Sequence, residues 1–223
     1  MPLLYLVRHG QPDFAGDYDS VTALGMQQSV WLGEHFAARG LRFARAVSGS
    51  LRRQANTLEA IMGRLPAAPP MRVDPRLNEY DPASVLAAFG GGDEPGLRAA
   101  GDRRSYFAAL RAALRAWASD AEMPGGGETW RAFGERITAA ASEAGVGLER
   151  SDAVLLVTSG GVIGRLVADA LGAGADAAIE LNLQTRNTGI TELVQGRSTS
   201  RLLSFNAVPH LELPERAHAV THS

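Results

Sequence analysis

The chain has 223 residues, of which 45% are hydrophobic and 21% charged, and its formal net charge is −2. This composition is ordinary for a soluble globular protein, and the length suits a single domain with a sizeable core. The charge balance gives no overall basic field, so we expect neither nucleic acid nor a membrane surface as a partner.

The residue types that are absent exclude several kinds of chemistry. There is no cysteine, which rules out disulfides, thiol catalysis and cysteine-held metals. All 22 basic residues are arginine, which rules out a Walker lysine and a Schiff-base lysine. No apolar run reaches membrane-spanning length, and the chain opens directly on its first strand. We therefore expect a cytoplasmic protein.

The first element is a buried strand that ends in reactive residues. Residues 3–7 form a short apolar run, followed by Arg8, His9 and Gly10. Ligand sites of open α/β sheets lie beyond the carboxyl ends of the strands. Arg8 offers a fork of donors to a phosphate or carboxylate, His9 is a candidate nucleophile or proton carrier, and Gly10 allows close approach to the backbone. The alternative interpretation is a plain polar turn.

A second unit of strand and helix follows. The polar loop 11–20 leads to Thr22, a candidate N-cap for a helix that extends to Gly40. Residues 43–47 are typical of a short strand, and the next helix runs from Leu51 to about residue 64, with Arg52 and Arg53 in its first turn.

The middle of the chain changes in composition. A brief strand at 72–73 leads into residues 74–80, and from about 80 to 127 the chain is rich in Ala and Arg, with a predicted helix over 102–119. Glycine triplets at 90–92 and 125–127 bracket this segment. We interpret it either as an insertion that acts as a lid over the strand ends or as a connector that packs on the sheet.

The last third alternates again between strands and helices. We predict a helix over 128–144, a buried strand over 153–157 and a helix over 162–171, joined by Thr158, Ser159, Gly160 and Gly161. A strand, glycines and a helix N-terminus together favour phosphate binding. Further short strands are predicted at 179–183, 188–194 and 201–205, and we expect a loosely held polar tail from about 209.

These motifs, in this order, resemble the histidine phosphatase superfamily, which includes the cofactor-dependent phosphoglycerate mutases. The similar segments, which cover residues 3 to 210, are Leu-Val-Arg8-His9-Gly10-Gln11, Thr22-Ala-Leu-Gly, Leu51-Arg-Arg53 with Thr57, Leu77-Asn-Glu79, Gly126-Gly-Glu128, Val157-Thr-Ser-Gly-Gly161 and Asn187-Thr-Gly-Ile-Thr191. The element order and the resemblance predict a single domain over 1–223, with a three-layer α/β/α sandwich, a mostly parallel central sheet and a helical insertion over the carboxyl ends of the strands.

The resemblance also implies roles for the site residues. His9 would attack a phosphoryl group and form a phosphohistidine that water hydrolyses. Arg8 and Arg53 would hold the phosphoryl oxygens, and Glu79 would protonate the leaving oxygen and then activate water. Ser159 and Gly160 would complete the phosphate site. The scheme requires no metal or other cofactor.

The sequence departs from the family pattern at Ser159, where the family has a second histidine. Losing one transition-state donor typically costs about 10²- to 10³-fold in rate, which describes a slower enzyme and not an inactive one. Other interpretations stay open: Ser159 as a plain N-cap, Glu79 as a surface ion-pair partner, and Arg53 as a solvated helix residue. His35 is most simply a packing residue.

Three functions therefore follow from the sequence. The first is a metal-independent phosphatase that acts on a phosphorylated small molecule or a phosphorylated protein. The second is a degenerate phosphatase fold that binds a phosphorylated ligand or partner without turnover. The third, a phosphoglycerate mutase, is less favoured because it must retain its phosphohistidine. The substrate and the oligomeric state do not follow from the sequence.

Overall fold

The computed structural model describes residues 2–90, 96, 98, 101–119, 122–196 and 200–222. Its strands are β1 (Leu3–Arg8), β2 (Arg45–Ser48), β3 (Met71–Val73), β4 (Ala153–Thr158), β5 (Ile190–Val194) and β6 (Arg201–Ala207). Its helices include α1 (Ala23–Ala38), α2 (Arg52–Met62), α3 (Pro82–Ala88), α5 (Arg103–Ser119), α6 (Trp130–Ala144), α7 (Gly160–Leu171) and α8 (Ala175–Gln184). Short 3₁₀ turns lie at η1 (Pro75–Leu77) and η2 (Pro214–Ala219).

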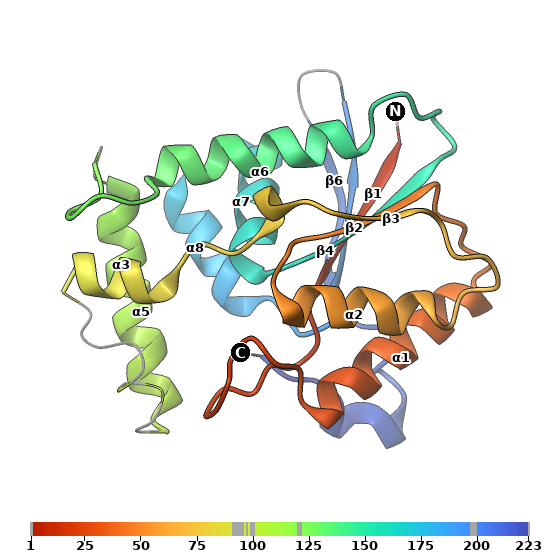
Figure 1. The fold of residues 1–223 in the computed structure, drawn as a ribbon, viewed down its shortest axis with the longest axis horizontal. Coiled ribbons are helices and arrows are strands. Elements are labelled where there is room, and N and C mark those ends of the chain that lie inside the picture. The colour runs from red at the N-terminus through yellow and green to blue at the C-terminus, as the bar shows by residue number, and fades with distance from the viewer. Residues whose placement is uncertain are drawn as a thin grey trace.

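The strands form one mixed sheet in the order β3-β2-β4-β1-β5-β6 (Figure 1). The four strands from β3 to β1 are parallel, and β5 is antiparallel to both of its neighbours. In the central pair Arg8 lies opposite Thr158, so the residues that follow them, His9 and Ser159, leave the sheet at the same edge. The predicted α/β sandwich with a mostly parallel sheet is confirmed.

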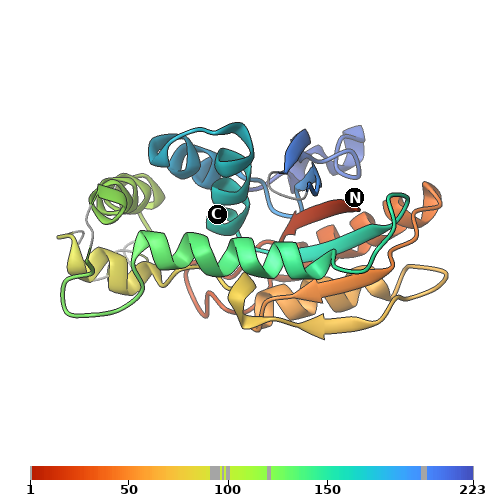
Figure 2. The same cartoon turned by 90° about the horizontal axis from the view of Figure 1, so that it is seen from above.

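Helices cover both faces of this sheet because the central strands are apolar on both sides. Tyr5 and Val7 pack with Leu32 of α1 and Ile61 of α2. On the opposite face, the side chains that pack together from β1, β4, α6 and α7 include Leu4, Leu6, Leu156, Phe133, Ile137, Ile163 and Val167. Figure 2 shows α6 lying along the sheet on the side away from α1 and α2. Continuous apolar runs buried on both faces are typical of such parallel strands.

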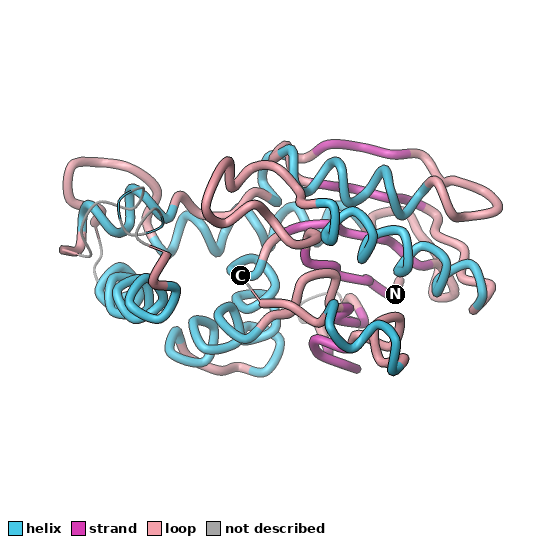
Figure 3. The backbone as a smooth tube through the Cα atoms, turned by 90° about the horizontal axis from the view of Figure 1, so that it is seen from below, coloured by secondary structure: helices cyan, strands magenta, loops and turns pink. Residues whose placement is uncertain are grey.

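The segment between β3 and α6 forms the end of the molecule away from the sheet, where α3 and α5 lie (Figures 1 and 3). The buried face of α5, with Tyr106, Leu110, Leu114 and Trp117, belongs to the main hydrophobic core. Gly90 and Gly125 to Gly127 all have positive φ, between 77° and 123°, which glycine adopts without strain. Gly91 and Gly92 lie outside the described residues.

Two expectations about the last third were wrong. Residues 179–183 belong to helix α8 and form no strand, because Ala178, Ile179 and Asn182 face the core at helical spacing. The tail is also well packed: Val208, Leu211 and Ala219 form a buried cluster against α1. The described helices include none that is long and apolar enough to cross a membrane.

Candidate active site

The loop after β1 is held tightly by α1 and α2. The amide of Gly10 donates to Thr57 Oγ1 at 2.9 Å, and the Thr57 hydroxyl donates to the carbonyl of Arg53. A Cβ on Gly10 would lie 2.4 Å from the carbonyl oxygen of Gly25. The glycine is therefore required by the backbone of α1, and the expected close approach at this position is made by the protein itself.

His9 is buried and is oriented through both ring nitrogens. Nδ1 lies 2.8 Å from the Gly10 carbonyl oxygen, which can only accept, so Nδ1 carries the proton. Nε2 is therefore unprotonated, and its lone pair accepts from Arg53 Nε at 3.2 Å. Burial, with the charges of Arg53 and Arg8, holds the pKa of His9 well below its usual value. His9 is thus a neutral imidazole with Nε2 available as a nucleophile.

Arg53 is only 5% exposed, so it is not a solvated helix residue. Its NH1 group lies 2.9 Å from Asp19 Oδ1, and Asp19 also accepts from the backbone amides of Arg52 and Arg53 at the start of α2. The same guanidinium lies over the ring of Tyr18, with 5.0 Å between Arg53 Cζ and the ring centroid. Arg52 is exposed and pairs with Asp17. Asp19 therefore fixes Arg53 against His9.

Arg8 reaches the same pocket from the end of β1. It is 4% exposed, and one guanidinium nitrogen donates to the carbonyl of Thr185, after α8. Burial lowers its pKa, an effect that the nearby Tyr18 and Glu79 oppose. The two arginines thus reach the site from β1 and α2.

Glu79 points inward from the segment after η1. Its Oε2 accepts from the amide of Gly161 at 2.9 Å, and Oε1 accepts from the amide of Tyr80. Burial raises the pKa of this carboxyl, opposed by the Gly161 amide and by Arg53 and Arg8. Among the ion pairs of the described residues Glu79 has none, so it is not a surface ion-pair partner.

Ser159 occupies the N-cap position of α7, but its side chain makes no capping hydrogen bond. Its Oγ instead accepts from Gln54 Nε2 at 2.8 Å. Gly160 packs against Asn182 and lies near the guanidinium of Arg8: a Cβ there would be 2.6 Å from Asn182 Oδ1 and 3.7 Å from Arg8 Cζ. Gly160 thus lies between Asn182 and Arg8, and the next amide of α7, that of Gly161, is used by Glu79.

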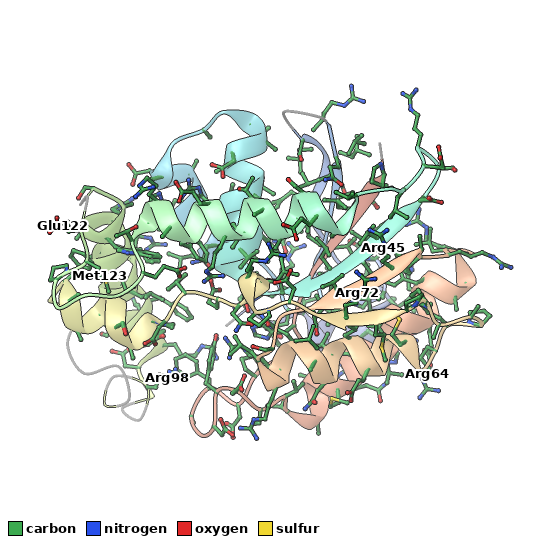
Figure 4. All side chains as sticks on the ribbon, turned by 45° about the horizontal axis from the view of Figure 1, so that its top comes forward. Arg45, Arg64, Arg72, Arg98, Glu122 and Met123 are labelled. Carbon is green, nitrogen blue, oxygen red and sulfur yellow. The ribbon has the colours of Figure 1, made fainter. Side chains whose placement is uncertain are left out.

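A cavity of about 640 Å³ opens beside these residues, lined among others by Tyr18, Asp19, Arg53, Glu79, Pro82 and Arg98. A smaller pocket continues to His9 and Arg8, with Tyr106, Phe107 and Leu110 of α5 in its wall. Figure 4 shows Arg98 between the helices of the insertion and the loop after β1, far from Arg45 of β2 and Arg72 of β3. The insertion thus contributes one wall of the cavity.

The described residues contain no group of three or more His, Asp or Glu side chains that could hold a metal ion. His35 packs on Phe36 and His210, which agrees with its interpretation as a packing residue.

The structure brings Arg8, His9, Arg53, Glu79, Ser159 and Gly160 to one edge of the sheet, from four separate segments. Sequence reasoning missed Asp19, Tyr18 and Gln54. The loop 11–20 holds three aspartates, and nothing in their spacing distinguishes the one that pairs with Arg53. Gln54 carries no signal beyond its place next to Arg53.

Comparison with known proteins agrees with this geometry. The family profile of the histidine phosphatase superfamily (branch 1) matches residues 4–208. A comparison with the curated proteins gave no match.

Several solved structures have the same fold. YhfR of Bacillus stearothermophilus is similar with a TM-score of 0.71 and 23% identity, over 95% of this chain and 100% of that chain. A putative α-ribazole-5'-P phosphatase of Escherichia coli is similar with a TM-score of 0.67 and 20% identity, over 93% of this chain and 97% of that chain. A mycobacterial glucosyl-3-phosphoglycerate phosphatase, solved with inorganic phosphate, is similar with a TM-score of 0.63 and 28% identity, over 93% of this chain and 98% of that chain. With a profile that matches almost its whole length, the chain belongs to the histidine phosphatase superfamily.

Proposed function

We propose that the chain is a phosphatase that hydrolyses a phosphomonoester through a phosphohistidine at His9. The observation that carries the proposal is the state of the His9 ring. Its Nδ1 proton is held by the Gly10 carbonyl, which leaves Nε2 as the unprotonated nitrogen, and Nε2 accepts from Arg53 Nε. Arg8, at the end of β1, supplies a second guanidinium for the phosphoryl oxygens.

The reaction has two steps. In the first, His9 Nε2 attacks phosphorus, the bond to the leaving oxygen breaks, and protonated Glu79 gives its proton to that oxygen. In the second, the Glu79 carboxylate takes a proton from water, the water oxygen attacks phosphorus, and the P–N bond breaks to release phosphate. The raised pKa of Glu79 suits its first role, since the carboxyl must begin protonated. No step needs a metal.

We propose a phosphorylated small molecule as the substrate. Two of the similar structures are phosphatases named for small phosphorylated substrates. The wall formed by Tyr106, Phe107 and Leu110 favours a leaving group with an apolar part. A phosphorylated protein side chain is the alternative substrate.

Release of phosphate tests this function. A panel of small phosphomonoesters and phosphopeptides is assayed with chelator present, for wild type, His9→Ala and the exposed control His218→Ala. We expect turnover on at least one ester, lowered roughly 10³-fold or more in His9→Ala because the covalent route is lost, and unchanged in the control. Phosphate binding without any turnover by wild type would instead favour a non-catalytic binding protein.

A further inference from the structure

Gln54 is a fully buried amide in the first turn of α2, directly after Arg53. Its Nε2 donates to Ser159 Oγ at 2.8 Å and to the Leu77 carbonyl at 3.3 Å. Because a carbonyl oxygen can only accept, the contact with Leu77 fixes which end of the amide faces Ser159. Ser159 Oγ is therefore the acceptor in its bond with Gln54.

The hydroxyl proton of Ser159 remains available for donation. Ser159 is 1% exposed, and within the described part of the chain its hydroxyl donates to no acceptor. A buried donor that stays unpaired destabilises the fold. An acceptor supplied by a bound ligand would remove that cost.

Ser159 and Gln54 each follow a residue that contacts His9. The amide of His9 donates to the Thr158 carbonyl at 2.9 Å, so Ser159 leaves β4 beside His9. Gln54 adjoins Arg53, whose Nε contacts His9 Nε2. In the proposed reaction, the group that arrives at His9 Nε2 is a phosphoryl group, whose oxygens accept hydrogen bonds.

Gln54 is poorly placed to be a stabilising residue. Its Oε1 is buried, has no hydrogen-bond partner among the described residues, and lies only 1.9 Å from where a Cβ on Gly49 would be. An unpaired buried carbonyl destabilises a fold, and an apolar side chain of the same shape would avoid that cost. Fold stability therefore does not explain why an amide side chain stands at position 54.

We propose that Gln54 is a positioning residue that holds the Ser159 hydroxyl as a hydrogen-bond donor to the phosphoryl group. The pair fills the place that the second histidine has in the family pattern. This inference rests on the proposed phosphatase function. It also has a steric consequence: an imidazole at position 159 would extend beyond the Oγ position, where Gln54 Nε2 lies only 2.8 Å away.

Single and double variants test the hydrogen bond. We expect Gln54→Met and Ser159→Ala each to lower kcat about 10- to 100-fold with little change in KM, because a donor to the transition state is lost. Inhibition by orthovanadate, which resembles the transition state, should weaken in parallel. The double variant should be no slower than the slower single variant, since both remove one interaction.

Gln195→Met is the matched control. Its amide also donates to a backbone carbonyl, that of Ser142, and its buried Oε1 likewise has no partner in the part of the chain that the structure describes. Gln195 follows β5, however, and lies at the opposite end of the sheet from His9. We expect wild-type kcat in this control. Thermal stability of Gln54→Met should equal or exceed that of wild type, which separates positioning from a structural role.

The steric conflict between Gln54 and an imidazole at position 159 provides a second test. Ser159→His alone should not raise turnover, whereas Ser159→His with Gln54→Ala should exceed both single variants. Wild-type kcat and vanadate inhibition in Gln54→Met, or a gain in Ser159→His with Gln54 present, would overturn the inference. His9→Ala reports separately on the phosphatase function. If wild type has no turnover, the affinity of the same variants for vanadate is measured by calorimetry instead. Weaker binding in Gln54→Met and Ser159→Ala would support the inference, and unchanged affinity in both variants would overturn it.

Discussion

The two ionisable side chains at the centre of the site have pKa values shifted in opposite directions. Burial and two neighbouring guanidinium groups lower the pKa of His9, and burial raises that of Glu79. The lowered pKa favours a neutral imidazole at His9, and the raised pKa favours a protonated carboxyl at Glu79. This is the combination that the first step of the proposed reaction requires.

Glu79→Gln tests this assignment through the pH dependence of kcat/KM. In wild type, kcat/KM should rise as pH increases through the lowered pKa of His9, since the imidazole must be neutral. It should fall as pH increases through the raised pKa of Glu79, since the acid must be protonated. We expect Glu79→Gln to be about 10²- to 10⁴-fold slower and to lack the descending limb, because glutamine cannot titrate.

A leaving group that needs no proton provides the control for this variant. On an ester of 4-nitrophenol, Glu79→Gln should lose much less of its rate in the first step than on an alkyl ester. A variant with full rate and an unchanged descending limb on the alkyl ester would show that Glu79 is not the acid.

Among the elements, α6 holds the segment that carries Glu79. Arg136 of α6 donates to the carbonyls of Arg76 and Asn78 at 2.6 and 2.7 Å, and it pairs with Glu128. On the other side, the Thr158 hydroxyl donates to the Leu77 carbonyl. The position of the carboxyl therefore depends on one arginine that lies outside the cavity.

We predict that Arg136→Leu is less stable by about 1–3 kcal/mol, because the carbonyls and the Glu128 carboxylate lose their donor. Its kcat/KM should fall as well, since Glu79 loses its fixed position. Urea unfolding and phosphate release measure the two effects. Arg131→Leu on the same helix, which removes an exposed ion pair with Glu135, should change stability by less than about 1 kcal/mol. Equal effects of the two variants would contradict this role.

Most elements could be predicted because their signals are local. Thr22 caps α1 by accepting from the amide of Gly25, as its position before the apolar pattern predicted. Helix α8 was missed because Ile179, Leu181 and Leu183 alternate as in a strand, although the segment is helical. The packing of the tail was missed because it depends on partners far along the chain, such as Gln28, whose Nε2 donates to the Ala219 carbonyl.

At the scale of the whole molecule, the parallel sheet explains how distant residues meet. Because β1, β2 and β4 run in one direction, the residues after their carboxyl ends share one edge, where His9, Arg53 and Ser159 gather. The sequence predicted this gathering from strand order and motifs. It could not predict the contacts that refine it, such as Asp19 with Arg53 or Gln54 with Ser159, because these join residues 34 and 105 positions apart.

The central claim is that His9 carries the phosphoryl group, and trapping that intermediate tests it most directly. Wild type is mixed with a radiolabelled phosphomonoester, quenched in alkali, and the labelled peptide is mapped. We predict label on His9 that is stable in alkali and lost in acid, as for a P–N bond, and no label in His9→Ala. Turnover with no labelled protein, or label on another residue, would contradict the account.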